Sequence, residues 1–239
     1  MMARRTLIVN ADDFGQSAGV NAGVAVAHES GIVTSASLMV RWPAAGAAAT
    51  YARTRPALSV GLHLDLGEWT CVGGRWESLY DVVPSGDETD VTRELDTQLA
   101  TFRLLVGRDP THLDSHQHVH RREPARSACL RAADRLGVPL RHFSPGVTYR
   151  GDFYGQGRDG SPNPRAISVD RLTEVLVSLP PGTSELACHP ALGADLKSMY
   201  QAERAVEVRT LCDPRVRSAL LRAGVRLISF ADYHSPVWE

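Results

Sequence analysis

The sequence has no cysteine pair and no long apolar run. Its four cysteines are scattered without a Cys-x-x-Cys motif, which is typical of reduced thiols in a cytoplasmic protein and not of a disulfide framework. No segment approaches the ~20 apolar residues of a membrane span. The apolar run that follows Arg4 and Arg5 is too short for a secretory signal. We therefore expect a soluble, cytoplasmic protein.

An excess of charge of either sign is also absent. The chain has 26 Lys and Arg against 27 Asp and Glu, which gives a formal net charge of -1 at pH 7. Without a basic excess, nucleic acid is not an expected partner. The oligomeric state stays open, with a homodimer as one option.

Strand-like runs alternate with helical patterns along the chain, which predicts a parallel α/β sheet in a single domain over residues 1–239. The expected strands are Thr6–Asn10, Thr34–Val40, Leu58–Leu64, Thr111–His116, Pro139–Phe143, Glu185–His189 and Val225–Phe230. About seven strands fit a closed or nearly closed barrel better than an open doubly wound sheet, which remains the alternative. Two long loops, Gly67–Asp87 and Ser144–Ser168, are expected to serve function because long loops in compact domains usually do.

Acidic residues and histidines follow several of these strands. Asp12 and Asp13 come directly after the first strand, His63 ends the third, and His189 ends the sixth. The carboxyl ends of parallel strands lie at one edge of a sheet, where α/β proteins place their active sites. We therefore expect these side chains to share one site.

The segment THLDSHQHVH continues from the fourth strand and carries acidic or histidine residues at every second position. They are His112, Asp114, His116, His118 and His120. They share a side only while the strand lasts. In extended geometry at ~3.3 Å per residue, His112 and His120 would lie ~26 Å apart, so the five residues cannot all bind one ion. One or two residues near the strand's end are the expected metal ligands, whereas His112, His118 and His120 can equally cap the chain or bond to backbone.

The adjacent carboxylates Asp12 and Asp13 can be interpreted in two ways. Aspartates before a glycine can form a simple polar turn. Here they follow a buried strand and accompany histidines from other strands, which favours a site. One carboxylate can bind a cation while the other stays free as a base, because the cation keeps both ionised.

The motifs NADDFG, GIVTSASLM, GLHL, THLDSHQHVH and CHPA, in this order, resemble the YdjC-type carbohydrate deacetylase family. That family includes chitooligosaccharide deacetylases and hopanoid-biosynthesis-associated deacetylases. The resemblance runs from Thr6 to about Phe230. It implies a distorted, TIM-like (β/α) barrel and an Asp-His-His metal site similar to that of polysaccharide deacetylases.

Residue by residue, the resemblance implies that Asp13, His63 and His116 bind one divalent ion. Mg²⁺ or Zn²⁺ is expected first, and Co²⁺ or Mn²⁺ also suits these ligands. Asp12 would be the catalytic base, and His189 would be the proton donor.

Two further residues are expected around the ligands. Asp114 would orient a ligand histidine, and His118 is placed beside it in the same outer layer. The substrate-binding residues are not identified. Aromatic residues of the two long loops can stack on sugar rings, although each can also simply pack; they are Trp69, Trp76, Tyr80, Phe153 and Tyr154.

The implied activity is metal-dependent hydrolysis that removes acetyl groups from an N-acetylated amino sugar, an oligosaccharide or a glycolipid, and releases acetate. Two alternatives remain. One is a metal-dependent hydrolase of a phosphoester or an O-acetyl ester, and the other is a non-catalytic sugar-binding barrel.

Overall fold

A computed structural model describes residues 4–83 and 86–233 of the chain. Within these residues, seven strands form one sheet in the spatial order β6-β3-β2-β1-β8-β7, and β9 pairs with the start of β1. Every pairing in this sheet is parallel. The strands are β1 (Arg5–Phe14), β2 (Ser35–Leu38), β3 (Ser59–Leu64), β6 (Leu113–Ser115), β7 (Val147–Arg150), β8 (Gly182–Cys188) and β9 (Val225–Leu227).

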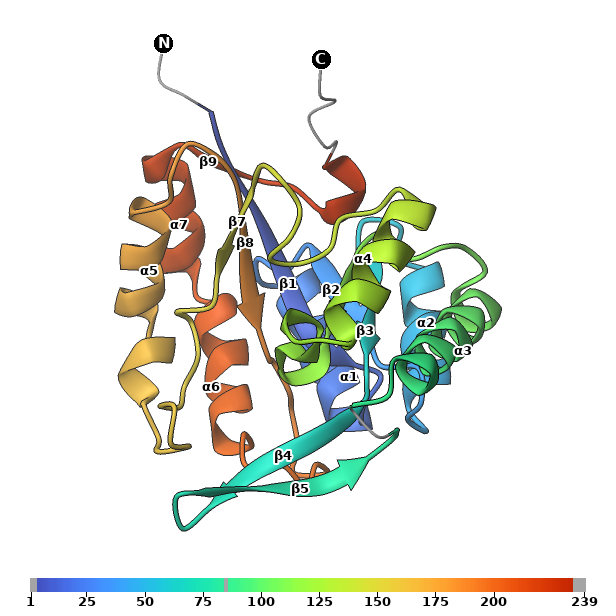
Figure 1. Cartoon of the computed structure of the whole chain (residues 1–239). Helices are drawn as coiled ribbons and strands as arrows, with labels where there is room; N and C mark the ends of the chain where they lie inside the picture. The colour runs from blue at the N-terminus through green and yellow to red at the C-terminus, as the bar shows by residue number, and fades with distance from the viewer. Residues whose placement is uncertain (1–3, 84–85, 234–239) are drawn as a thin grey trace.

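The sheet curls into a half-barrel whose path ends at β6 and β7 (Figure 1). The predicted α/β class, with about seven parallel strands in a distorted barrel, is therefore confirmed. An isolated bridge between Leu113 and Leu140 continues the sheet for one residue beyond β6.

The central strand β1 explains why the sequence begins with an apolar run. Every residue of β1 after Arg5 is buried, as expected for a strand of a parallel sheet that helices cover on its outer face. Apolar side chains from Leu7 to Val9 anchor the first half. The second half carries Asn10, Asp12 and Asp13, each at most 3% exposed. Burying such polar groups is costly unless they find partners, so this end of β1 must be surrounded by polar side chains.

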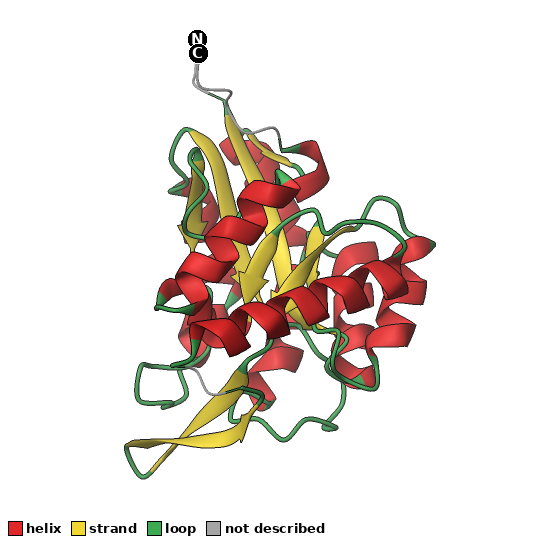
Figure 2. Cartoon of the chain, turned by 45° about the vertical axis from the view of Figure 1, so that its right-hand side comes forward, coloured by secondary structure: helices red, strands yellow, loops and turns green. Residues whose placement is uncertain are grey.

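In the described part of the chain, seven helices pack around the outside of the sheet (Figure 2). They are α1 (Ala18–Glu29), α2 (Ala45–Arg53), α3 (Glu88–Val106), α4 (Ala125–Leu136), α5 (Val169–Val177), α6 (Ala202–Leu211) and α7 (Pro214–Ala223). Helix α3 shows why these segments begin and end where they do. The Asp87 side chain accepts a hydrogen bond from the Asp90 N–H at its start, and Gly107 ends it with a left-handed φ of 81°.

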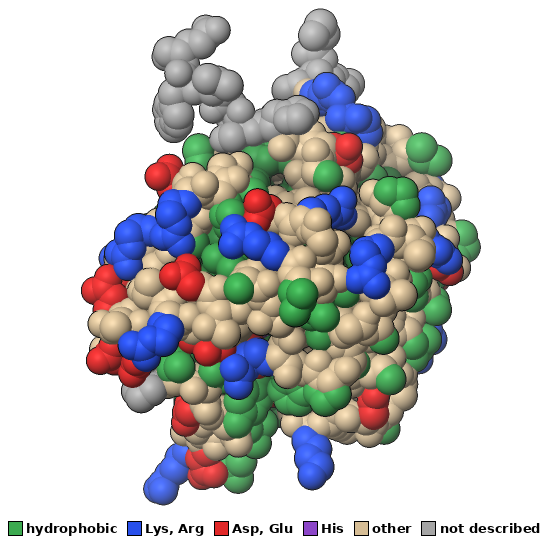
Figure 3. All heavy atoms as spheres, turned by 90° about the vertical axis from the view of Figure 1, so that its right-hand side faces the viewer, with side chains coloured by type: hydrophobic (Ala, Val, Ile, Leu, Met, Phe, Trp, Pro, Cys, Tyr) green, Lys and Arg blue, Asp and Glu red, His purple; other side chains and the backbone are tan. Residues whose placement is uncertain are grey.

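Acidic and basic side chains are interspersed on the face that carries α3 and α4 (Figure 3). Ion pairs join the two helices between Arg131 and Glu88 and between Arg135 and Asp96. All four side chains are about half exposed, so each pair adds little stability. Among the described residues, none of the helices combines the length and the apolarity that crossing a membrane requires.

One predicted strand was wrong. In the segment from Pro139 to Phe143, only Leu140 makes a β-bridge. The next side chain, Arg141, turns into a cluster of buried carboxylates, and His142 adopts a left-handed φ of 68° that ends the extended backbone. The sheet still has seven strands, because β7 forms within the second predicted loop and takes the place of the missing strand.

The two predicted loops contain regular structure. The first holds an antiparallel hairpin of β4 (Gly67–Val72) and β5 (Arg75–Asp81), which projects below the sheet in Figure 2. Gly73 and Gly74 connect its strands with φ values of 57° and 81°, as a two-residue hairpin turn requires. The second loop holds β7 and the short helix η2 (Pro164–Ile167). The Gly-Gly pair was the sequence signal for the hairpin.

Two glycines provide a matched test of this packing. In β3, a Cβ on Gly61 would lie 2.5 Å from both the ring and the carbonyl oxygen of His112, whereas a Cβ on Gly46 in α2 would meet nothing within 4 Å. We expect Gly61→Ala to destabilise the fold by ~1–3 kcal/mol through overpacking. Gly46→Ala should be neutral or stabilise by up to ~1 kcal/mol. Urea unfolding of both variants measures the difference, and equal stabilities would contradict the packing described for β3.

Candidate active site

Three strand ends bring Asp13, His63 and His116 together at the carboxyl edge of the sheet. One possible ligand atom from each lies within 4.8 Å of the other two. His63 Nε2 is 3.3 Å and His116 Nδ1 is 3.0 Å from the same oxygen, Asp13 Oδ1. One carboxylate oxygen and two imidazole nitrogens therefore converge on one point, which is a donor set that suits a divalent metal ion with open positions.

The second nitrogen of each imidazole faces a buried carboxylate. Asp114 Oδ1 lies 2.7 Å from His63 Nδ1, and Glu68 Oε2 of the hairpin lies 3.6 Å from His116 Nε2. Outer carboxylates of this kind orient metal-binding histidines and raise their basicity. Asp114 lies where the sequence predicted it. Glu68 was missed because it falls in a segment taken as a loop.

Charge in this cluster keeps the acid–base states well defined. Burial alone would lower the pKa of His63, but Asp114 and Asp13 beside it raise the pKa to about 10. In the same way, Asp13 outweighs burial and raises the pKa of His116 to about 9. Burial raises the pKa of Asp13, but Arg204 and His116 together hold it well below the ordinary value. Asp13 is therefore ionised, while His63 and His116 hold protons that a metal ion would have to displace.

Asp12 is held by an arginine that the sequence analysis missed. Arg141 donates to both oxygens of Asp12 at 2.7 and 2.8 Å, a two-pronged contact that fixes the carboxylate's orientation. Arg141 outweighs burial and lowers the pKa of Asp12. The guanidinium also contacts Asp114 Oδ2 at 2.8 Å and Glu185 Oε1 at 2.7 Å.

Arg204 is a second arginine that the sequence did not predict. Its Nη2 lies 2.7 Å from Asp13 Oδ2, and its Nε donates to the Tyr200 carbonyl at 2.7 Å. The residue comes from α6, and nothing in its spacing distinguishes it from Arg209, the other arginine of that helix.

His189 lies beside Asp12 at the end of β8. Its Nε2 is 3.8 Å from Asp12 Oδ2, and its side chain is 21% exposed, against 4% for Asp12. The ring packs edge-on against Tyr154 and Tyr200, with centroids 5.3 and 5.5 Å away. Burial lowers the pKa of His189 to about 4, so the free protein holds a neutral imidazole here at pH 7.

The remaining histidines of the fourth-strand segment do not alternate as predicted, because β6 ends at Ser115 and the chain turns into the short helix η1 (His116–Arg121). His112 is fully buried and stacks on Phe230 with ring centroids 3.8 Å apart, which is a packing role. His118 bonds to the Tyr149 hydroxyl at 3.2 Å. The sequence placed His118 beside the ligand histidines, but the contacts described for the Asp13 cluster do not include it.

The aromatic residues of the predicted loops lie in different surroundings. Phe153 is buried in the core, and Trp76 is 56% exposed on the hairpin. Tyr80 donates to Asp65 and packs edge-on against Trp42. Tyr154 stacks on Tyr200 and packs against His189, so its ring contacts the candidate site.

The candidate site therefore combines an Asp-His-His cluster with a second aspartate at the carboxyl edge of a curled parallel sheet. A family model described as YdjC-like protein matches residues 6–222. The chain belongs to the YdjC-like family.

Relatives and solved structures agree with this assignment. A carbohydrate deacetylase from Geobacillus stearothermophilus is 34% identical and covers 96% of this chain and 98% of its own length. A chitooligosaccharide deacetylase from Serratia marcescens is 33% identical over 95% of this chain and 99% of its own. These names support a deacetylase enzyme.

Among solved structures, an Enterococcus faecalis protein, provisionally described as a cellobiose-phosphate cleavage protein, has a TM-score of 0.78 and 26% identity and covers 96% of this chain and 98% of its own. A family 4 carbohydrate esterase from Streptomyces lividans has a TM-score of 0.56 at 12% identity, covering 99% of this chain and 100% of its own. The second likeness concerns the fold alone.

Glu207 of α6 supplies a test of the buried charges around the site. It is fully buried, accepts from the Tyr200 hydroxyl and the His189 N–H, and burial raises its pKa from 4.5 to about 8. Between these values the unfolded chain is ionised while the folded protein stays protonated. Stability therefore falls as pH rises, by at most ~1.4 kcal/mol per pH unit from this group.

Glu207→Gln should remove this contribution, because the amide does not titrate. We expect urea unfolding from pH 5 to pH 8 to show a smaller loss of stability in the variant than in the wild type. Glu174→Gln, which changes a side chain that is 67% exposed, is the control and should keep the wild-type slope. The same slope in Glu207→Gln as in the wild type would contradict the raised pKa.

Proposed function

We propose that this protein removes the acetyl group from an N-acetylated amino sugar by metal-dependent hydrolysis and releases acetate. The observation that carries the proposal is the convergence of Asp13, His63 and His116 on one point, with Asp12 and His189 beside them. The names of the relatives, carbohydrate and chitooligosaccharide deacetylase, support the substrate class.

Asp13, His63 and His116 would hold one divalent ion, with Mg²⁺ or Zn²⁺ as the leading candidates. When bound, such an ion polarises the acetyl carbonyl and makes a water molecule more acidic. Asp12 stands next to this position, is ionised, and has its carboxylate fixed by Arg141. It is therefore suited to take the proton from the attacking water.

His189 would return a proton to the departing amine, which is a poor leaving group unless protonated. At pH 7 its imidazole starts neutral, because burial lowers its pKa to about 4. The proton that His189 gives must therefore reach it during the reaction. Asp12, whose Oδ2 lies 3.8 Å from His189 Nε2, can hand over the proton taken from water.

The direct test of the function is acetate release from a panel of substrates. The panel contains N-acetylated mono- and disaccharides, an N-acetylated glycolipid, O-acetyl sugar esters and a disaccharide phosphate, each with Mg²⁺ or Zn²⁺ and after chelation. We expect metal-dependent acetate release from an N-acetylated sugar. Phosphate or cleaved sugar from the disaccharide phosphate, without acetate release from any N-acetyl compound, would overturn the proposal. The cytoplasmic location, the single domain and the homodimer stay predictions.

The two adjacent aspartates should separate in function. Asp12→Asn should keep the metal and lose ~10²–10⁴ of the rate, because an amide does not accept the proton. Asp13→Asn should also lose metal, because an amide oxygen is a weaker ligand than a carboxylate. Metal content by elemental analysis and acetate release check both. If the two variants retain equal amounts of metal, this division of roles is wrong.

His189 can be tested through the leaving group. His189→Ala should slow amide cleavage by ~10²–10⁴. Cleavage of an activated aryl acetate should slow much less, since that leaving group departs without a proton. Metal content should stay at the wild-type level. An equal loss of both activities would show that His189 positions the substrate and does not protonate the amine.

A further inference from the structure

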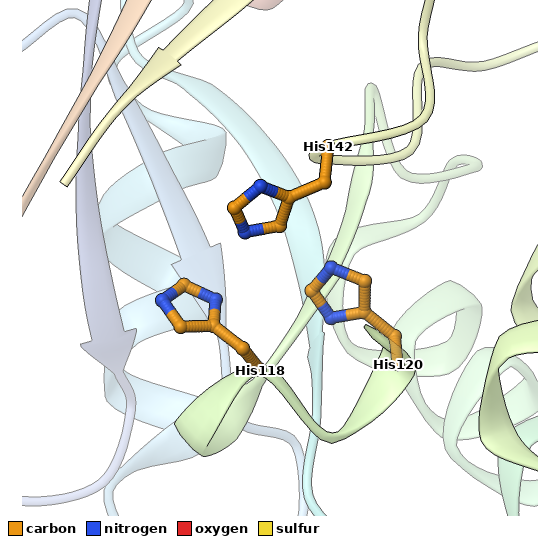
Figure 4. Close-up of side chains that lie close together, drawn as sticks. All are labelled: His118, His120 and His142. Carbon is orange, nitrogen blue, oxygen red and sulfur yellow. The ribbon is translucent and has the colours of Figure 1, made fainter. Parts of the chain in front are cut away.

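Three histidines outside the Asp13 cluster meet beside the segment that carries Arg141. His118 and His120 come from η1, and His142 comes from the segment that follows the Leu113–Leu140 bridge. One ring nitrogen of each lies within 4.8 Å of the other two. Figure 4 shows the three imidazoles around a common space, with nitrogens of His118 and His142 turned toward each other. We call these residues the tri-histidine cluster.

Two nitrogens of the tri-histidine cluster lack a partner. His118 Nδ1 and His142 Nε2 are buried and make no hydrogen bond, although leaving a buried polar atom unpaired costs ~1–3 kcal/mol. The other nitrogen of His118 contacts the Tyr149 hydroxyl at 3.2 Å. A metal-binding histidine has this arrangement, with one nitrogen held by an outer polar group and the other free for the ion.

His120 completes the cluster from a more constrained position. Its Nε2 faces the Arg141 carbonyl at 3.2 Å, and its Nδ1 lies 2.5 Å from Ser115 Oγ. To bind an ion it must exchange one of these contacts. The Ser115 contact is the easier to give up, because a hydroxyl can rotate and also accepts from the His120 N–H at 3.0 Å.

The backbone also holds two of these residues in place. His118 and His142 have φ values of 55° and 68°, in the left-handed region that residues other than glycine rarely adopt. In the described part of the chain, the other residues besides glycine with positive φ are Asp13 and Gln117, and Asp13 belongs to the first cluster. Such conformations persist where the surrounding structure fixes them, often at functional sites.

The chemistry of the tri-histidine cluster differs from that of the Asp13 cluster. The guanidinium of Arg141 nearby would repel a cation, but Asp12, Asp114 and Glu185 neutralise it. The cluster offers three imidazoles and no carboxylate, which suits Zn²⁺ and related transition metals and does not suit Mg²⁺.

We propose that His118, His120 and His142 form a second metal site, which binds one ion of the Zn²⁺ class with three imidazoles and an open fourth position. The site shares no ligand with Asp13, His63 and His116. It lies against the segment that carries Arg141, so its ion would tie η1 to the residue that holds Asp12.

The test counts metal in tag-free protein that has been stripped with a chelator and titrated with Zn²⁺ against a chromophoric competitor. We expect two Zn²⁺ per wild-type chain and one in His118→Asn and in His142→Asn. Asparagine is chosen because it tolerates the left-handed backbone. His28→Asn, which changes a histidine on α1, is the matched control and should keep two. Far-UV circular dichroism before metal addition checks that each variant is folded.

A second pair of measurements separates this proposal from the proposed function. His63→Ala should keep one Zn²⁺, and His63→Ala combined with His142→Asn should keep none. Mg²⁺ in excess should displace Zn²⁺ less from the tri-histidine cluster than from the Asp13 cluster. One Zn²⁺ per wild-type chain that His63→Ala abolishes, or two that survive in both asparagine variants, would overturn the second site and leave the deacetylase proposal intact.

Discussion

The guanidinium of Arg141 is the interaction on which the rest of the site depends. It lies fully buried among Asp12, Asp114 and Glu185, three carboxylates that could not otherwise share a water-free interior. Removing one partner from a buried ion cluster leaves an uncompensated charge and typically costs ~3–5 kcal/mol. The same guanidinium fixes the carboxylate of Asp12, the proposed base, and that of Asp114, which contacts His63. Folding and the proposed chemistry therefore draw on a single side chain.

The strand-end rule accounts for the site residues that could be predicted. Asp12, Asp13, His63, His116 and His189 each stand where a parallel strand ends, so their meeting follows from the topology of a parallel sheet alone. The roles assigned to them remain predictions. The rule also applied to Arg141, because a strand was expected over Pro139–Phe143, but neither Arg141 nor His142 was singled out within that strand.

The other site residues that the sequence analysis missed lie on a helix and on the hairpin. Arg204 and Glu207 lie on the inward face of α6. Which polar residues of a helix face inward depends on packing against segments that are far away in the sequence. Glu68 lies on a hairpin taken as a loop, although Gly73 and Gly74 carried a recognisable turn signal. His118 was expected beside the ligand histidines; the backbone makes a left-handed turn at Gln117 and His118, and the His118 ring contacts His142 and Tyr149.

The hairpin is joined to the site through two neighbouring pairs. Glu68 faces the His116 ring, and the Gln117 side chain donates to the Trp69 carbonyl at 2.7 Å and accepts from its N–H at 2.9 Å. Two adjacent residues of the hairpin therefore contact two adjacent residues that directly follow β6. In engineering terms the two parts are not modular. Replacing the hairpin also replaces the residue that faces His116, so a change made to the hairpin reaches the proposed metal site as well.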